Sequence, residues 1–417
     1  MKILWITNVL FDYHHCLLGN DRNMVSTSGS WLSAAYDATT KDNNIELHIA
    51  TTSSVPELMY GKSEGSTFYI LPGGPMFKYN CHSLENIKQV KILRSLINPD
   101  LILIWGTESR FAWLVSKIFD DVPKYVYMQG VLSSIVDHYY DAVPFIYRIS
   151  TIKDWIYYIL RRTPLQIYKR HIQYEADILN YSKGVIVEND WCEFQCLEKN
   201  RNLQIIRDNL PIKSSYYNRV WDFSKVEQYS IFTNAGGSPI KGHHILFKAM
   251  AIVKKEFPNV KLYIPGHNYL KDQKIYIKRS GYIKYLYSLF QKYNLSDNIE
   301  FTGVLSSDEM AEYIQKSNVY VMPSLVENHS SSLIEAMIVG APCITSLVGG
   351  TANLIKYGIN GYIYNSLEPQ TLAGCILNLF RNPDKAVALA NEALKLRESR
   401  TQNFQRVLLE LENMLSK

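Results

Sequence analysis

The chain of 417 residues is long enough for two or three domains of average size. Hydrophobic residues make up 47% of it and charged residues 20%, which is typical of a globular protein and excludes wholesale disorder, collagen and coiled coil. The 44 lysines and arginines face 39 acids, for a net charge of +5. This bias is too weak to indicate a nucleic-acid partner.

Positive charge is concentrated in two tyrosine-rich segments. Residues 145–173 contain six basic residues and one acid, and residues 269–293 have the same count. Outside both segments 32 basic residues remain against 37 acids. The distribution therefore predicts two local basic surfaces on an otherwise slightly acidic protein.

The opening residues Met1–Asn8 predict a buried strand rather than a signal peptide, because the apolar run is short and no small-residue cleavage site follows it. No stretch reaches 18 consecutive apolar residues, so a membrane-spanning helix is not expected. The six cysteines are scattered, which predicts free thiols in a reducing compartment rather than a disulfide framework or a zinc site.

Short apolar runs alternate with segments of helical period along the chain. In the first half, strands are predicted at 3–7, 46–50, 101–105, 125–128 and 184–187, and helices at 31–36, 84–97, 111–118 and 172–180. After a turn-rich stretch at 209–221, strands are predicted at 229–233, 261–264, 299–302, 319–322 and 343–346, and helices at 244–257, 307–315, 331–339, 370–381 and 384–396. Two such series predict an α/β chain with two doubly wound, Rossmann-like domains and a cleft between them.

The common phosphate-binding motifs are absent from the sequence. No two glycines lie two apart, so the dinucleotide fingerprint is missing, and Gly237 and Gly242 have P-loop spacing without the Lys-Ser/Thr that should follow. No two aspartates lie two apart either, which argues against a metal-held sugar nucleotide. A nucleoside triphosphatase is therefore not expected.

Two other segments carry candidate chemistry. Residues 234–242 lie between a strand and a helix, where the backbone of Gly236 and Gly237 could approach a diphosphate and Lys241 could add a positive charge. Residues 323–337 follow a strand and open a helix whose first amides could bind an anion, with Glu327 before the helix and Glu335 inside it. The alternatives are a plain turn with a solvated lysine, and a solvent-exposed helical glutamate.

Several motifs in fixed order narrow this choice. They are Pro323-Ser324, Glu327, Glu335-Ala336-Met337, Gly340-x-Pro342, Gly349-Gly350 and Gly358-x-Asn360-Gly361, preceded by Lys241-Gly242, Gly266 and Phe301-x-Gly303. Together they resemble the nucleotide-sugar domain of retaining glycosyltransferases of family 4, which have the GT-B fold. The form is similar to a subset found in bacterial surface and capsular polysaccharide synthesis. The match is strong over residues 230–364 and loose in the N-terminal half.

The resemblance implies an acceptor-side domain at 1–212, a nucleotide-sugar domain at 213–399 and a last helix within 400–417 that crosses back to the N-terminal domain. It implies that Glu327 contacts the transferred sugar, that Glu335 holds the ribose, and that Lys241 stabilises the diphosphate as the bond breaks. Gly303 and Val304 would border the nucleobase. The full set of implied donor contacts is Glu335, Gly236, Gly237, Gly242, Gly266, Gly303, Val304, Asn328, Ser330, Ser331 and Ser332.

The sequence departs from the family pattern in two places. Gly236 stands where the family usually has an arginine five residues before the lysine, so a second cation would have to come from elsewhere, such as Arg207 or Lys213. Asn353 stands where an acidic residue is expected after Gly349-Gly350.

In the N-terminal half, Gly29 lies in a stretch that resembles the loop facing the diphosphate. Glu108 and Gln129 follow two predicted strands where relatives show histidines, so they are candidate substrate contacts and any general base is unassigned. The alternative for Glu108 and Gln129 is that they are ordinary polar loop residues.

The sequence thus predicts a retaining glycosyltransferase that uses a UDP- or GDP-sugar, needs no cofactor or metal, and acts on a glycan or lipid-linked acceptor in the cytoplasm. Two alternatives stay open: a nucleotide-sugar epimerase of the same fold, and a catalytically degenerate regulatory subunit that binds sugar nucleotides or glycans.

Membrane contact is predicted for residues 145–173. Apolar residues recur there at helical spacing among basic ones, as expected for a peripheral helix on the anionic inner face of the cell membrane. The apolar set is Phe145, Ile149, Ile152, Ile156 and Ile159. The alternative is an amphipathic helix buried against its own domain.

Overall fold

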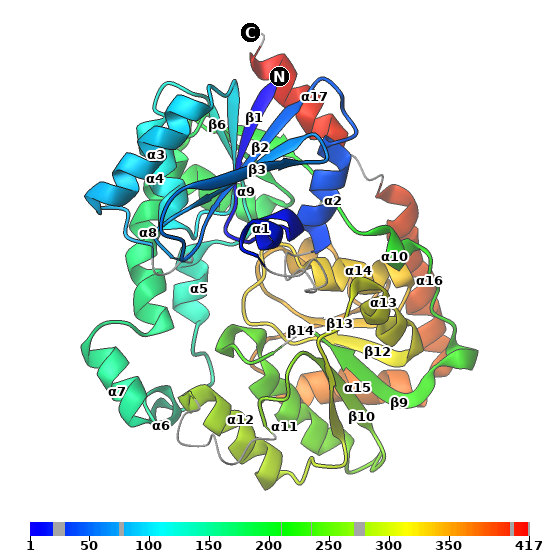
Figure 1. The fold of residues 1–417 in the computed structure, drawn as a ribbon. Coiled ribbons are helices and arrows are strands. Elements are labelled where there is room, and N and C mark those ends of the chain that lie inside the picture. The colour runs from blue at the N-terminus through cyan, green and yellow to red at the C-terminus, as the bar shows by residue number, and fades with distance from the viewer. Residues whose placement is uncertain are drawn as a thin grey trace. The chain divides into compact units, whose positions relative to one another are not determined.

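The structure is a computed structural model, and it describes residues 1–19, 30–74, 79–209, 211–234, 236–270, 280–400 and 404–415. The chain forms two compact units (Figure 1). The first unit comprises Met1–Ser133, Ile167–Pro211 and Gln402–Lys417, and the second comprises Ser134–Gln166 and Ile212–Thr401.

The first unit is built on an eight-stranded sheet with the order β3-β4-β2-β1-β5-β6-β7-β8. Every pairing is parallel except that of the edge strand β3, which forms an antiparallel hairpin with β4. The strands are β1 (Lys2–Ile6), β2 (Glu46–Thr52), β3 (Met59–Ser63), β4 (Ser66–Leu71), β5 (Leu101–Trp105), β6 (Lys124–Tyr127), β7 (Gly184–Val187) and β8 (Gln204–Arg207). The central strand β5 is buried at every position, because helices cover both faces of a parallel sheet.

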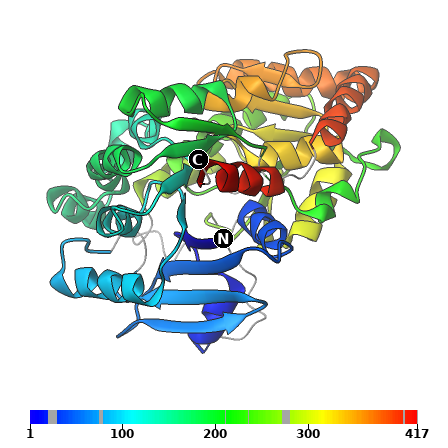
Figure 2. The same cartoon turned by 90° about the horizontal axis from the view of Figure 1, so that it is seen from above.

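The helices of the first unit follow these strands. They are α1 (Asp12–Leu17), α2 (Ser30–Thr39), α3 (Leu84–Leu96), α4 (Arg110–Ile118), α9 (Asp190–Lys199) and α17 (Phe404–Leu415), while α5 (Leu132–His138) and α8 (Pro164–Asn180) span the points where the two units divide. The last helix, α17, packs beside α2 (Figures 1 and 2). Its Phe404 ring lies 6.1 Å from the ring of Trp5 and 5.5 Å from that of Trp105. The prediction of a final helix on the N-terminal domain is therefore confirmed.

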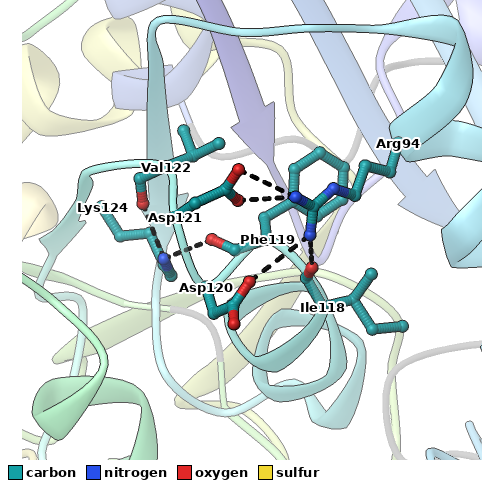
Figure 3. A network of polar contacts seen from close by, with 7 residues as sticks. All are labelled: Arg94, Ile118, Phe119, Asp120, Asp121, Val122 and Lys124. Carbon is teal, nitrogen blue, oxygen red and sulfur yellow. Dashed lines mark hydrogen bonds and ion pairs between the residues drawn. The ribbon is translucent and has the colours of Figure 1, made fainter.

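A polar network closes the turn between α4 and β6 (Figure 3). Arg94 of α3 donates both to the carbonyl of Ile118 and, at 2.8 Å, to Asp121. Lys124 is 1% exposed and donates to the carbonyls of Phe119 and Val122, each at 2.6 Å. Burial lowers the pKa of Lys124 to about 8. This network lies at the amino end of β6, so it stabilises the edge of the sheet opposite to that where parallel sheets bind ligands.

The second unit is built on a six-stranded, fully parallel sheet with the order β11-β10-β9-β12-β13-β14. The strands are β9 (Glu227–Thr233), β10 (Lys261–Pro265), β11 (Ile299–Gly303), β12 (Ser317–Met322), β13 (Cys343–Ser346) and β14 (Tyr362–Tyr364). The α-helices are α6 (Phe145–Arg148), α7 (Ile152–Ile159), α10 (Ser214–Tyr217), α11 (His243–Val253), α12 (Gly281–Lys292), α13 (Ser307–Lys316), α14 (Ser331–Val339), α15 (Pro369–Arg381) and α16 (Pro383–Ser399). Short 3-10 turns are η1 (Phe223–Lys225), η2 (Pro239–Lys241) and η4 (Gly349–Asn353).

Residues Ser134–Gln166 belong to the second unit through contacts far apart in sequence. The Nε2 atom of His244 lies 3.0 Å from the carbonyl of Asp141, and the Tyr147 ring lies 4.9 Å from that of Tyr285. The two units therefore differ in this segment from the predicted domains 1–212 and 213–399, whose boundaries stay a prediction.

Within the described ranges, no helix has both the length and the apolar character that crossing a bilayer requires.

Candidate functional site

The glycine-rich turn after β9 packs directly on the loop after β12. Gly242 ends the 3-10 turn η2 with φ of 69°, and a Cβ placed there would lie 1.8 Å from the carbonyl oxygen of Pro323. The amide of Leu325 donates to the carbonyl of Ile240 at 2.7 Å. Only glycine permits both this left-handed backbone and this close approach. The turn and the loop are thereby held together at the carboxyl edge of the second sheet.

Replacing Gly242 by alanine is expected to destabilise the second unit by more than about 2 kcal/mol, because strain at positive φ and the clash with Pro323 act together. Urea unfolding followed by circular dichroism measures this. The matched control is Gly374→Ala in the middle of α15, where an added Cβ meets nothing within 4 Å. That change should be neutral or slightly stabilising. Equal unfolding midpoints for both variants would contradict the proposed contact.

Lys241 and Glu327 form an ion pair where this turn and loop meet. Lys241 Nζ lies 2.7 Å from Glu327 Oε1, and the two side chains are 34% and 13% exposed. A partly exposed pair of this kind stabilises a fold by only about 0–1 kcal/mol. Its importance is therefore that it places a cation and a carboxylate together at the edge where parallel sheets bind ligands. Lys241 is thus paired but still one-third exposed, so the diphosphate role and the alternative of a plain turn with a solvated lysine both stay predictions.

Glu335 lies inside α14 and is 4% exposed, so the alternative of a solvent-exposed helical glutamate is wrong as well. Its carboxylate hydrogen-bonds the hydroxyl of Tyr216, a buried residue of α10. Burial and then the negative charge of Glu335 raise the pKa of Tyr216 above its ordinary value. Tyr216 is a partner that the sequence pattern did not indicate, because it lies more than a hundred residues before Glu335. The ribose contact of Glu335 stays a prediction.

The start of α14 is capped by its own serines. Ser330 Oγ accepts from the amide of Leu333 at 3.3 Å and lies 3.1 Å from Ser332 Oγ. Ser331 is the first helical residue, and Asn328 in the preceding loop is buried. The helix therefore begins where the sequence predicts it, and anion binding at its first amides stays a prediction.

Gly266 and Gly303 lie side by side at the ends of β10 and β11. The amide of Gly266 donates to the carbonyl of Gly303 at 2.7 Å, and both residues have positive φ. A Cβ added to either would meet no atom within 4 Å, and the neighbouring Val304 is 52% exposed. The structure thus leaves open space where the sequence predicts the nucleobase.

The position of Gly236, where the family has an arginine, is filled by the ring of His243. A Cβ at Gly236 would lie 2.0 Å from His243 Cε1, whereas Gly237 is more open, with Tyr269 at 3.8 Å. His243 is buried, with Nδ1 2.7 Å from the hydroxyl of Tyr269 and Nε2 3.1 Å from the carbonyl of Asn234. Burial lowers the pKa of His243 to about 4. A neutral histidine therefore stands beside this turn, and it supplies no second cation at neutral pH.

Of the two cations considered for that role, Arg207 is already engaged. It pairs with Glu193, and it lies 2.5 Å from Asp190, in the first unit. Lys213 precedes α10 in the second unit as its N-cap residue.

In the first unit, Glu108 and Gln129 meet over Gly106 at the carboxyl ends of β5 and β6. A Cβ at Gly106 would lie 2.3 Å from Glu108 Oε2 and 3.2 Å from Gln129 Oε1. Burial raises the pKa of Glu108 to about 7, and the negative charge of Glu175 acts in the same direction. The structure brings this predicted pair together; its contact with substrate stays a prediction. Gly29 lies outside the described residues.

Glu175, for which the sequence suggested no chemistry, has a structural role beside that pair. It accepts from Thr107 Oγ1 at 2.7 Å and from the amide of Leu132, and Lys199 lies 3.6 Å away. These contacts tie the ends of β5 and β6 to α8 and α9.

Among the residues that the structure describes, no group of three or more His, Cys, Asp or Glu side chains is placed to hold a metal ion. All six cysteines are free thiols, and Cys192 and Cys196 are buried together in α9.

Part of the chain matches a known protein family and several known proteins. Residues 223–396 match the family model described as "Glycosyl transferases group 1". Spore coat protein SA of Bacillus subtilis is 31% identical over 183 residues, which cover 43% of this chain and 45% of that protein. The protein named "Putative glycosyltransferase YtcC" of the same organism is 27% identical over 173 residues, which cover 41% of each chain. The chain thus matches less than half of the length of these relatives.

Solved structures resemble the whole chain. Sucrose-phosphate synthase from Thermosynechococcus elongatus has a TM-score of 0.67 at 19% identity and covers 99% of this chain and 98% of its own. HepE of Anabaena, solved with UDP and glucose, has a TM-score of 0.67 at 16% identity with full coverage of both chains. These likenesses show the fold: the chain has the GT-B fold, with two Rossmann-like α/β units.

Proposed function

We propose that the protein is a retaining glycosyltransferase of family 4 that moves a sugar from a UDP- or GDP-sugar to a glycan or lipid-linked acceptor. The observation that carries this proposal is the Lys241–Glu327 ion pair at 2.7 Å, at the carboxyl edge of the second sheet and inside the matched residues 223–396. The UDP bound to HepE of Anabaena supports a nucleotide-sugar donor.

In the proposed reaction, Lys241 acts on the leaving group. When the bond between the anomeric carbon and the donor phosphate breaks, negative charge grows on the nucleoside diphosphate, and the ammonium group stabilises it. Glu327, which neutralises Lys241 in the absence of donor, would accept hydrogen bonds from hydroxyls of the transferred sugar. The acceptor oxygen forms the new bond on the same face from which the diphosphate leaves, and its proton passes to the departing phosphate oxygen.

The rest of the site would position the donor. Glu335 would hold the ribose, Gly303 and Val304 would border the base, and the amides at Ser330–Ser332 would face the phosphates. Such positioning converts a reaction between two partners into a nearly intramolecular one. In the first unit, Glu108 and Gln129 would contact the substrate.

The biological setting is a further part of the proposal. We infer a role in bacterial surface polysaccharide synthesis, in the cytoplasm and at the inner face of the cell membrane. The exposed α6–α7 segment, residues 145–160, supports the membrane position. Seven of its large apolar side chains are between 49% and 81% exposed, whereas Ile149 is partly buried. The seven are Phe145, Ile146, Ile152, Trp155, Ile156, Ile159 and Leu160. No residue of α7 is buried, which argues against the alternative of a buried amphipathic helix for residues 152–159.

Titration with nucleoside diphosphates tests the donor part of the proposal. UDP or GDP is expected to bind in calorimetry with EDTA present, because Lys241 and the amides of α14 would carry the diphosphate without a divalent ion. Complete loss of nucleotide affinity on chelation would contradict it. Assays with the matching sugar donor then separate the alternatives: an epimerase converts the donor without transfer, and a regulatory subunit binds it without turnover.

A further inference from the structure

A cluster of lysines in the second unit lies away from the candidate site and from Lys241. Four lysines line an open cavity of about 530 Å³ between the end of α11, the end of α12 and the start of α15. They are Lys248, Lys254, Lys255 and Lys292. The helix α11 begins next to Lys241 and ends at this cavity, so its eleven residues separate the two by roughly 16 Å.

The charge of this lysine pocket is not balanced by neighbouring acids. Among the described residues, none of the four ammonium groups forms an ion pair with a carboxylate. The two acids nearest in sequence are held elsewhere: Glu256 pairs with Arg381, and Glu368 accepts from Asn365 and from Thr371 at 2.7 Å.

The contacts that the lysines do make leave their charge in place. Lys254 donates to the carbonyl of Asn294 at 2.6 Å, and the ammonium groups of Lys248 and Lys292 lie over the rings of Tyr285 and Tyr293. Burial, together with the charge of Lys292, lowers the pKa of Lys248. The negative charge of an anion in the pocket would reduce the repulsion among the lysines. It would also offset the cost of holding the Lys248 ammonium group partly away from water.

The lysine pocket and α6 lie against the same helix, α12. Tyr285 contacts Lys248 on one side and the ring of Tyr147 in α6, at 4.9 Å, on the other. From Tyr285 to Lys292 the helix α12 advances by about 10 Å. Figure 1 shows α6, α12 and α11 in succession, and the element contacts agree. An apolar exposed segment and a cluster of positive charge thus flank one helix.

We propose that the lysine pocket takes the phosphate headgroup of an anionic phospholipid while the α6–α7 segment inserts its apolar side chains into the same bilayer. This rests on the membrane position in the proposed function, and not on the sugar-transfer chemistry. A membrane surface provides both kinds of partner: apolar material for the exposed side chains and fixed negative charge for the lysines.

Sedimentation of the full chain with phosphatidylcholine vesicles, with and without phosphatidylglycerol, tests the proposal. The variant Lys255→Gln/Lys292→Gln is expected to bind phosphatidylglycerol vesicles roughly 30-fold more weakly, from the usual contribution of two basic residues near an anionic surface. The matched control is Lys88→Gln/Lys91→Gln, which removes two lysines of α3 in the first unit and should bind as wild type does.

The apolar segment is tested in the same assay. Ile152→Ser/Ile159→Ser should weaken binding to both kinds of vesicle, whereas Leu84→Ser, at an 84% exposed site, should not.

Three outcomes would overturn the proposal. The pocket variant and its control could lose the same affinity, which would indicate net charge alone. Inorganic phosphate could bind in calorimetry while the vesicle affinities stay equal, which would indicate a site for a free anion. Finally, wild type could fail to bind vesicles and form a dimer in sedimentation equilibrium that Ile152→Ser/Ile159→Ser abolishes. That result would indicate that the apolar segment contacts a second copy of the chain.

Nucleotide affinity, measured on the same samples, should be unchanged by Lys255→Gln/Lys292→Gln, so failure of the donor proposal is recognised separately.

Discussion

Replacing Lys241 by alanine is expected to lower kcat for sugar transfer by about 10²–10³-fold, the usual loss when one group that stabilises developing charge is removed. The ground-state affinity for the donor should fall less. In the free protein Lys241 is already paired with Glu327 at 2.7 Å, so donor binding only exchanges one carboxylate partner for the diphosphate. The charge that builds up on bond cleavage has no such compensation.

Steady-state kinetics with the donor identified by calorimetry measure this effect. The control is Lys225→Ala, since Lys225 is an exposed residue of η1 that pairs with Asp222 at 2.9 Å. The double variant Lys241→Ala/Glu327→Ala should lose less than the product of the two single effects, because the residues share one contact. Unchanged kcat in Lys241→Ala, with the fold intact, would remove Lys241 from the mechanism.

Replacing Glu335 by alanine is expected to weaken donor binding by about 1–3 kcal/mol, the usual value for a hydrogen bond to a charged group, with a smaller effect on kcat. The same change removes one of the two hydrogen-bond partners of the buried Tyr216 hydroxyl and leaves Ser307, so the protein should also become less stable. The two effects therefore need separate measurements.

Tyr216→Phe is the matched variant for this purpose. It removes the hydrogen bond to Glu335 while it keeps the carboxylate, so donor affinity should stay close to wild type. Calorimetric donor titrations and urea unfolding of both variants distinguish the roles. If Glu335→Ala changed neither the donor constant nor kcat, the assignment of Glu335 to the nucleotide would be wrong.

The repeating elements of both units could be predicted from the sequence because their signals are local. Short apolar-rich runs predicted β7 at 184–187 and β13 at 343–346, and helical period predicted α14 at 331–339, all with the bounds that the structure shows. Strands β4, β8 and β14 were not predicted, and neither was the edge strand β3, which lacks an apolar run because it is half exposed and carries Gly61 and Lys62. It forms because the turn at Glu64-Gly65 folds it antiparallel onto β4.

The sequence by itself determined which residues carry the candidate chemistry and in what order they occur. These are the ordered motifs, the glycines at strand ends, and the carboxylates and the lysine near them. Only the tertiary structure decided which of these residues meet, because the contacts span distances in sequence at which no periodicity operates. Lys241 reaches Glu327 across 86 residues, and His244 holds the 134–166 segment to the second unit across 103. Packing also placed the ring of His243 against Gly236, where the motif pattern that this sequence resembles has a cation. The ring is neutral because burial costs a charged imidazole more than its hydrogen bonds return.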